Sequence, residues 1–165
     1  MKQFDIYIDG SHLDKQNNGR LGVGGVLVDL NDSGNKMGKL LNKFSTELTP
    51  EYMKLSFGAD KCSNPSAELT ALLHALYQFK GSYGPSDKIV VHADYLGVKE
   101  WMTGNWKIKE PYIARIKSDI DREITKQGLQ GRIEFKWVKG HQKNNTNPDV
   151  YWNNFVDSLA KGEDE

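Results

Sequence analysis

The order in which hydrophobic periods follow one another constrains the fold of this chain most strongly. Three strand-like segments come first, at residues 4–9, 22–30 and 36–48, and the turn cluster 31–35 separates the second from the third. From Asn64-Pro65 onward, segments with the helical period alternate with short apolar runs. We therefore predict helices from residue 64 to Gly81 and at 96–102, 112–127 and 148–160, and strands at 89–94 and 132–138.

This order of elements predicts an α/β fold. Three strands joined by short turns, followed by alternating helices and strands, are typical of a mixed sheet with helices packed on its faces. A chain of 165 residues suits one ordinary domain, and it contains no internal repeat, linker or low-complexity tract. We therefore predict a single domain over residues 1–161 and an acidic tail at 162–165.

Composition excludes several classes of protein. The 22 basic residues balance 22 acidic ones, so the molecule as a whole is not a strongly basic nucleic-acid binder. One cysteine, Cys62, rules out an internal disulfide, and no apolar run approaches the ~20 residues that span a bilayer. The N-terminus has no signal-peptide core. We therefore expect a cytoplasmic monomer with no membrane association, and the sequence implies no protein partner.

The neutral total hides an uneven distribution of charge. Residues 95–143 carry 11 Lys and Arg against 6 Asp and Glu, a net charge of +5, so the remainder carries −5. Such a chain can present a basic face to a polyanion and gather carboxylates elsewhere. A chance imbalance on solvated helices is the alternative on charge alone.

Four acidic residues stand where chemistry could use them. Asp9 and Asp94 end the first and fourth predicted strands, and ligands of open sheets usually bind at the carboxyl ends of strands. Glu68 lies at the edge of the apolar stripe of its helix, where a half-buried carboxylate needs a partner such as a metal ion. Asp157 shares a face of the last helix with Asn153. Turn formation, a helix-dipole contact and a solvated helix face are the respective alternatives.

The position of Glu68 within its helix favours a functional role. With Pro65 at the first helical position, we expect Asn64 to be the N-cap, and a capping-box acid would then stand at Ala67. Glu68 comes one residue too late for that role. We therefore expect its carboxylate to point toward the sheet rather than to the end of the helix.

Convergence of these carboxylates would require a cation. Acids without compensating bases repel one another, and bound Mg²⁺ or Mn²⁺ is the stable solution, because these hard cations prefer oxygen ligands. No Cys/His spacing indicates zinc. His141 follows the last predicted strand and enters a polar loop, from which it could shuttle protons near neutral pH. An ordinary surface histidine is the alternative.

Six segments taken together resemble the type 1 ribonuclease H family. They stand in the family's order and cover nearly the whole chain: IYIDGS at 6–11, GVGGV at 22–26, NPSAEL at 64–69, VHAD at 91–94, WVKGH at 137–141 and NNFVD at 153–157. The resemblance implies a ribonuclease H-like α/β fold, with a five-stranded mixed sheet flanked by helices. It also implies a site for two Mg²⁺ ions, which Mn²⁺ can replace.

The resemblance assigns a reaction and roles to particular residues. Asp9, Glu68, Asp94 and Asp157 match the family's metal-binding acids. His141 matches its mobile-loop histidine, which aids product release or proton transfer. The implied reaction is endonucleolytic hydrolysis of the RNA strand of an RNA–DNA hybrid, and it leaves 3′-hydroxyl and 5′-phosphate ends.

Candidate substrate-binding residues come from the same segments. Asn64 matches a family residue that contacts the hybrid near the scissile strand, and Ser11 and Asn153 belong to matching segments beside the acids. Leu96 stands where many members carry a glutamine near the substrate. We therefore expect one contact with the hybrid to differ from the family pattern.

Aromatic and basic residues after the fourth predicted strand are further candidates for substrate binding. Trp101 and Trp106 are five residues apart and do not share a helical face, so we expect one in the core and the other as a platform for the DNA strand. Lys107 and Lys109 are candidates for phosphate contacts. Bacterial members often carry a longer basic protrusion here, whereas Glu110-Pro111 leads straight into the next helix. We expect this shortening to weaken substrate binding.

Other functions stay open from the sequence alone. A DNA-directed nuclease of the same fold, or a domain acting beside a reverse transcriptase, would keep the acids and change the substrate. A non-catalytic hybrid-binding module would have no reason to retain a repulsive cluster of carboxylates. The Gly-rich segment 22–25 is a weak candidate for nucleotide binding, because it precedes a strand and lacks the helix that would cradle a phosphate.

Overall fold

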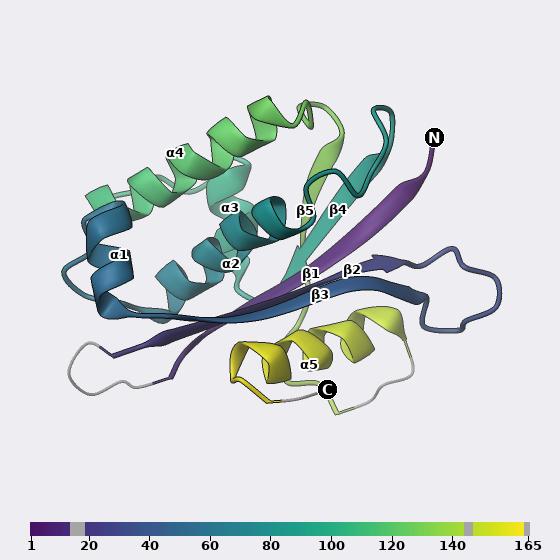
Figure 1. The fold of residues 1–165 in the computed structure, drawn as a ribbon, viewed down its shortest axis with the longest axis horizontal. Helices are drawn as coiled ribbons and strands as arrows, with labels where there is room; N and C mark the ends of the chain where they lie inside the picture. The colour runs from purple at the N-terminus through teal and green to yellow at the C-terminus, as the bar shows by residue number, and fades with distance from the viewer. Residues whose placement is uncertain (14–18, 144–146, 164–165) are drawn as a thin grey trace.

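The sheet is the frame of the molecule in the computed structural model, which describes residues 1–13, 19–143 and 147–163 (Figure 1). The strands are β1 (Gln3–His12), β2 (Leu21–Asp29), β3 (Lys39–Leu48), β4 (Lys88–Ala93) and β5 (Ile133–Trp137). These five form one sheet in the order β3-β2-β1-β4-β5. The first three pair antiparallel, whereas β4 runs parallel to both β1 and β5. The prediction of a five-stranded mixed sheet is confirmed.

Helices cover both faces of the sheet unequally (Figure 1). They are α1 (Pro50–Phe57), α2 (Asn64–Gln78), α3 (Leu96–Met102), α4 (Pro111–Lys126) and α5 (Pro148–Ala160). Four of them, α1 to α4, lie on one side, and α5 lies on the other, beneath β1, β2 and β3. The predicted α/β architecture with flanking helices is therefore confirmed. None of these described helices has the apolar length that crossing a lipid bilayer requires.

Two apolar cores follow from the alternation of side chains along β1. Ile6 and Ile8 point toward α2 and join the larger core, whereas Tyr7 points to the opposite face and joins a smaller core under α5. Trp152 and Val156 are the main contributions of α5 to that smaller core. The single helix α5 is thus held by much less apolar surface than the helices on the other face.

Helix α1 was not predicted from the sequence. Thr49 caps it by accepting a hydrogen bond from the backbone N–H of Tyr52 at 3.1 Å, and Gly58 ends it in the left-handed conformation. Within its eight residues, Met53 and Phe57 are the buried ones, one turn apart. An amphipathic stripe of two residues is too short to stand out as a helical period.

The expected N-cap of α2 was wrong by one residue. Ser63, rather than Asn64, is the cap, because its hydroxyl accepts from the backbone N–H of Ser66 at 3.3 Å while the Ser66 hydroxyl accepts from the backbone N–H of Ser63 at 3.0 Å. A serine therefore completes the capping box. The conclusion for Glu68 is unaffected, since it lies two residues beyond the box and takes no part in capping.

Strand β1 is longer than predicted. It does not end at Gly10-Ser11 but continues to His12, because these residues pair with Val23, Gly22 and Leu21 of β2. Asp9 consequently lies within β1 rather than at its end, with its neighbour Ile8 paired to Ala93 of β4. Asp94 follows directly after Ala93. Because β1 and β4 are parallel neighbours, both carboxylates lie toward the same end of these inner strands.

Candidate active site

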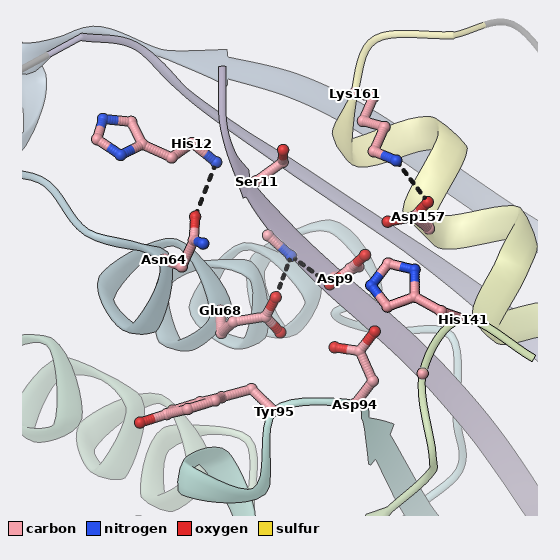
Figure 2. Close-up of a pocket in the computed structure, with 12 residues that line it drawn as sticks. Asp9, Ser11, His12, Asn64, Glu68, Asp94, Tyr95, His141, Asp157 and Lys161 are labelled. Carbon is pink, nitrogen blue, oxygen red and sulfur yellow. Dashed lines mark hydrogen bonds and ion pairs between the residues drawn. The ribbon is translucent and has the colours of Figure 1, made fainter. Parts of the chain in front are cut away.

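A cleft of about 470 Å³ opens beside β1 and beyond the end of β4, and we call it the acidic cleft (Figure 2). Helix α2 lies on one side of it and α5 on the other. Its lining residues are Asp9, Gly10, Ser11, His12, Asn64, Glu68, Asp94, Tyr95, Gly140, His141, Asp157 and Lys161. All five residues predicted to be catalytic therefore line one cleft.

Three of the predicted acids form a compact group. One carboxylate oxygen from each of Asp9, Glu68 and Asp94 lies within 4.8 Å of the other two. Asp9 and Glu68 are buried, and Asp94 is partly buried. Asp157 reaches toward the group from α5, where Lys161, one turn later, places its Nζ 3.0 Å from Asp157 Oδ2. The sheet and the two flanking helices thus bring four carboxylates to one place.

Gly10 joins α2 to β1 at the centre of this group. Its backbone N–H donates to Asp9 Oδ1 at 3.0 Å and to Glu68 Oε1 at 3.1 Å. A Cβ at this position would lie 2.3 Å from the backbone carbonyl carbon of Ala67. Only glycine therefore allows the first turns of α2 to approach β1 closely enough for Glu68 to meet Asp9.

Burial and mutual repulsion disfavour the charged forms of these acids. Burial raises the pKa of Glu68 to about 8, and the charges of Asp94 and Asp157 act in the same direction. Burial, and then the charge of Glu68, raise the pKa of Asp9 well above its usual range. Burial also raises the pKa of Asp94. The cluster therefore binds protons or cations more readily than isolated carboxylates do.

The donor set of the cluster fits a hard divalent cation. All the converging ligand atoms are carboxylate oxygens, which Mg²⁺ and Mn²⁺ prefer. Glu68 Oε2 is buried and has no hydrogen-bond partner among the described residues. A buried charged oxygen without a partner is costly, and a coordinated cation would satisfy it.

His141 lies at the mouth of the acidic cleft, on the segment between β5 and α5 (Figure 2). Its backbone has a φ of 56°, in the left-handed region. Gly140 passes close to Asp94, since a Cβ on it would lie 2.9 Å from Asp94 Oδ2. His141 was predicted from sequence to sit on a loop near the last helix, and this placement is confirmed. The remainder of the predicted polar loop includes residues 144–146, which lie outside the described residues.

The predicted substrate-binding residues occupy three places. Ser11 and Asn64 line the acidic cleft, where Asn64 Oδ1 accepts from the backbone N–H of His12 at 3.2 Å. Asn153 of α5 is buried, and its side chain hydrogen-bonds to Asp94. The other four line a second cleft of about 420 Å³, which we call the tryptophan cleft: Trp101, Trp106, Lys107 and Lys109.

The two tryptophans differ in burial, but neither belongs to the buried core that one of them was expected to join. Trp101 packs against the larger core, whereas Trp106 is 41% exposed. Their rings meet edge to face with centroids 6.3 Å apart. Trp101 therefore packs against the ring of Trp106, and part of the Trp106 ring stays exposed at the tryptophan cleft.

The sequence analysis missed other residues that line the acidic cleft. Lys161 follows Asp157 by four residues, a spacing that signals an ion pair on a helix, and it could have been found in this way. His12 and Tyr95 flank recognised segments, and only the folded structure shows that they face the cleft. Gly140 was quoted as part of a segment but not as a neighbour of Asp94.

A mixed sheet that gathers carboxylates beside its central parallel strands, between two helices, defines an enzyme site suited to cation-assisted chemistry. The sequence profile of the RNase H family matches residues 1–164. The chain therefore belongs to the ribonuclease H family and is a nuclease.

Individual relatives agree with this family. Ribonuclease H of Anaplasma marginale (strain St. Maries) is 31% identical over 120 residues, which cover 68% of this chain and 71% of that protein. Among solved structures, RNase H1 of the halophilic archaeon Halobacterium salinarum NRC-1 matches with a TM-score of 0.68 and 21% identity, over 96% of this chain and 94% of that one. LC11-RNase H1 in complex with an RNA/DNA hybrid matches with a TM-score of 0.71 and 20% identity, over 97% and 95%. At these identities the two structures are similar to this chain in fold.

Proposed function

We propose that this protein is an endonuclease that hydrolyses the RNA strand of RNA–DNA hybrids with two metal ions and leaves 3′-hydroxyl and 5′-phosphate ends. The observation that carries this proposal is the convergence of Asp9, Glu68 and Asp94 within 4.8 Å, with Asp157 facing them across the acidic cleft. Four carboxylates outnumber Lys161, the lysine that lines the cleft with them, so they are a poor binding surface for a polyanion unless cations lie between them. With cations, they are a site for phosphodiester hydrolysis.

In the proposed mechanism, the residues of the chain hold the reacting groups in place. Bound Mg²⁺ would supply an activated water and neutralise the charge that develops on the leaving 3′-oxygen. Asp9, Glu68 and Asp94 would provide one set of oxygen ligands, and Asp157 would complete a second set from α5. His141, at the mouth of the cleft, would move a proton or help the product leave.

The hybrid as substrate is supported by the surroundings of the acids. Ser11 and Asn64 line the acidic cleft, where the RNA strand with its 2′-hydroxyl groups would lie. The tryptophan cleft, with Trp106 and two lysines, suits the sugars and phosphates of the DNA strand. LC11-RNase H1, which has a similar fold, was solved in complex with an RNA/DNA hybrid.

The proposal is tested by a cleavage assay on RNA–DNA hybrid, double-stranded RNA and double-stranded DNA, each with and without Mg²⁺. We expect cleavage of the hybrid alone, with Mg²⁺, and products with 5′-phosphate ends. Cleavage of double-stranded DNA would make the protein a DNA-directed nuclease. Tight hybrid binding without cleavage in either Mg²⁺ or Mn²⁺ would make it a binding module.

We also propose that residues 1–161 act as a single domain, in a cytoplasmic monomer. The sheet spans β1 to β5 without a break, and α5 packs back on β1 and β2. Sedimentation of the intact protein at micromolar concentration would report the oligomeric state.

Replacing both Lys107 and Lys109 by alanine should raise KM for the hybrid more than it lowers kcat. These exposed lysines would contact phosphates in the ground state and the transition state alike, so their loss removes uniform binding. The slope of log KM against log salt concentration should also become shallower, by the amount that corresponds to the loss of about two phosphate contacts. Replacing Lys36 and Lys54, which are exposed outside this region, removes the same charge and should leave KM unchanged.

His141→Ala should lower kcat and leave both KM and Mg²⁺ affinity close to those of the parent. Proton transfer by a positioned histidine typically contributes ~10²–10⁴-fold, whereas losing a metal ligand should remove nearly all activity. Steady-state kinetics and titration calorimetry with Mg²⁺ measure the two quantities separately. A parental kcat would identify an ordinary surface histidine, and a loss of Mg²⁺ affinity would identify a metal ligand.

A further inference from the structure

Among the described elements, α5 alone covers its face of the sheet, and it carries both Asp157, which lines the acidic cleft, and Asn153, which is buried one turn earlier. Asn153 hydrogen-bonds to Asp94, and Asp157 lines the cleft together with Asp9 and Asp94. The apolar core beneath α5 is the smaller of the two cores. The placement of these two side chains therefore depends on whatever fixes α5 along and across the sheet.

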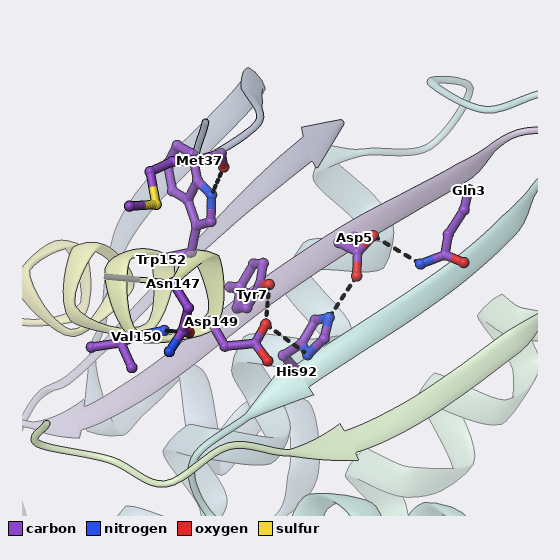
Figure 3. Close-up of polar contacts among 9 residues, drawn as sticks. All are labelled: Gln3, Asp5, Tyr7, Met37, His92, Asn147, Asp149, Val150 and Trp152. Atoms are coloured by element: carbon purple, nitrogen blue, oxygen red, sulfur yellow. Dashed lines mark hydrogen bonds and ion pairs between the residues drawn. The ribbon is translucent and has the colours of Figure 1, made fainter. Parts of the chain in front are cut away.

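A group of four polar residues ties the first turn of α5 to the sheet, and we call it the α5 anchor: Asp5, Tyr7, His92 and Asp149 (Figure 3). The Tyr7 hydroxyl donates to Asp149 Oδ1 at 2.5 Å. His92 Nδ1 lies 3.8 Å from the same Asp149 oxygen, while His92 Nε2 lies 2.7 Å from Asp5 Oδ2. The rings of Tyr7 and His92 stack with centroids 4.2 Å apart. Asp149 thus contacts β1 and β4 together.

The residues of the α5 anchor and those of the acidic cleft lie at matching spacings along the same strands and the same helix. Tyr7 precedes Asp9 by two residues and His92 precedes Asp94 by two, which is one repeat of a strand. On α5, Asn153 and Asp157 follow Asp149 by four and eight residues, so all three share one helix face. Fixing Asp149 against Tyr7 and His92 therefore sets where Asn153 and Asp157 meet the carboxylates of β1 and β4.

We propose that Asp149 is a positioning residue for hydrolysis, which acts through Tyr7 and His92 to hold α5 where Asn153 and Asp157 face Asp94 and Asp9. This inference rests on the proposed function of the acidic cleft. It assigns no contact with substrate to Asp149, which lies in the first turn of α5, two turns before Asp157.

Other contacts keep α5 on the sheet without fixing its first turn. Trp152 Nε1 donates to the backbone oxygen of Met37 at 2.6 Å, and Ser45 Oγ donates to the backbone oxygen of Leu159 at 2.6 Å. These contacts reach β3 and the turn before it. Loss of Asp149 should therefore leave α5 packed on the sheet, but its first turn could then shift relative to β1 and β4.

The burial of the partners indicates which contact in the anchor matters most. The Asp149 side chain is 51% exposed, and its Oδ1 lies 3.8 Å from His92 Nδ1, which is too far for a hydrogen bond. Tyr7 is fully buried, and Asp149 is the hydrogen-bond partner of its hydroxyl among the described residues. Removing Asp149 leaves that buried hydroxyl without an acceptor, whereas Asp149→Asn retains an acceptor oxygen.

The test compares Asp149→Ala, Asp149→Asn and Tyr7→Phe with the control Asn147→Ala. Asn147 caps α5 by accepting from the backbone N–H of Val150 at 3.1 Å, so its loss destabilises the same helix without touching the anchor. For each variant, Tm, kcat and KM on the hybrid and Mg²⁺ affinity are measured. The parent, assayed alongside, must cleave the hybrid; if it does not, the proposed function fails rather than this inference.

We expect Asp149→Ala to lower kcat roughly 10- to 100-fold, because displacements of about 1 Å at a reacting centre have effects of this size. KM should change little, Mg²⁺ affinity should fall, and Asp149→Asn should recover most of the activity. Tyr7→Phe combined with Asp149→Ala should be no worse than Asp149→Ala alone. Asn147→Ala should keep the parental kcat. The inference is overturned if Asp149→Ala keeps the parental kcat, or if Asn147→Ala loses as much kcat at an equal loss of Tm.

Discussion

Asp94→Asn should abolish hydrolysis of the hybrid and leave the protein folded and no less heat-stable than the parent in metal-free buffer. Asparagine keeps the size of the side chain and an oxygen that can accept from Asn153, but it removes the negative charge that a divalent cation needs. It also removes one of the charges that repel one another around Glu68. The experiment measures cleavage with Mg²⁺ and Tm with EDTA.

The stability effect of Asp94→Asn should depend on pH in a definite direction. Burial raises the pKa of Asp94 in the folded protein, so the stability linked to its protonated form is lost as pH rises through that folded-state value. Asp94→Asn has no carboxyl group at this position, so its stability does not fall in this way as pH rises. Its Tm should therefore match the parent's near pH 4 and exceed it near pH 8, and each 1 kcal/mol of relief would appear as ~2–4 °C.

Asp121→Asn is the matched control for this substitution. Asp121 lies on the surface of α4, half exposed and paired with Lys117 at 2.7 Å. Its replacement should leave both cleavage and Tm close to those of the parent, since surface substitutions of this kind usually change stability by less than ~0.5 kcal/mol. Full activity of Asp94→Asn, with the control behaving as described, would refute a role for Asp94 as a metal ligand.

The sequence predicted those parts of the fold that local patterns determine. Alternation and turn residues identified the strands, and α3 and α5 were predicted with the bounds that the structure has. The candidate acids could also be predicted, because Asp9 and Asp94 stand at the ends of predicted strands, whereas the parallel pairing of these two strands is a finding of the structure. Their common location was implied by the resemblance to the ribonuclease H family.

The parts that could not be predicted depend on contacts between residues far apart in the chain. Tyr7 and Asp149 are 142 positions apart, and no sequence pattern pairs them. Alternation along residues 4–9 does not show whether the side of the strand that carries Tyr7 faces solvent or a helix, and the structure buries Tyr7 under α5. Similarly, the Ser63 cap depends on a reciprocal bond with Ser66 that competes with the equally plausible cap Asn64. The Tyr7–Asp149 contact, the burial of Tyr7 and the choice of Ser63 as the cap therefore become visible only in the folded structure.

Gly10→Ala should destabilise the protein and inactivate it. A methyl group here would meet the backbone of α2, 2.3 Å from the carbonyl carbon of Ala67 and 2.5 Å from the nitrogen of Glu68. Backbone atoms cannot relieve the clash by a change of rotamer, as a side chain can, so α2 must move away from β1. Overpacking of this kind costs roughly 3 kcal/mol, which corresponds to a fall in Tm of about 6–12 °C.

The loss of activity in Gly10→Ala should exceed what the loss of stability explains. The Gly10 N–H donates to both Asp9 and Glu68, so moving α2 breaks at least one of these bonds and separates the two carboxylates. Below its Tm, the folded variant should therefore bind Mg²⁺ more weakly and show little cleavage. Gly34→Ala is the control, because a methyl group at Gly34 meets nothing within 4 Å, and it should leave Tm and activity unchanged. If Gly10→Ala matched the parent in Tm, Mg²⁺ affinity and cleavage, the close approach of α2 to β1 could not be what brings Glu68 to Asp9.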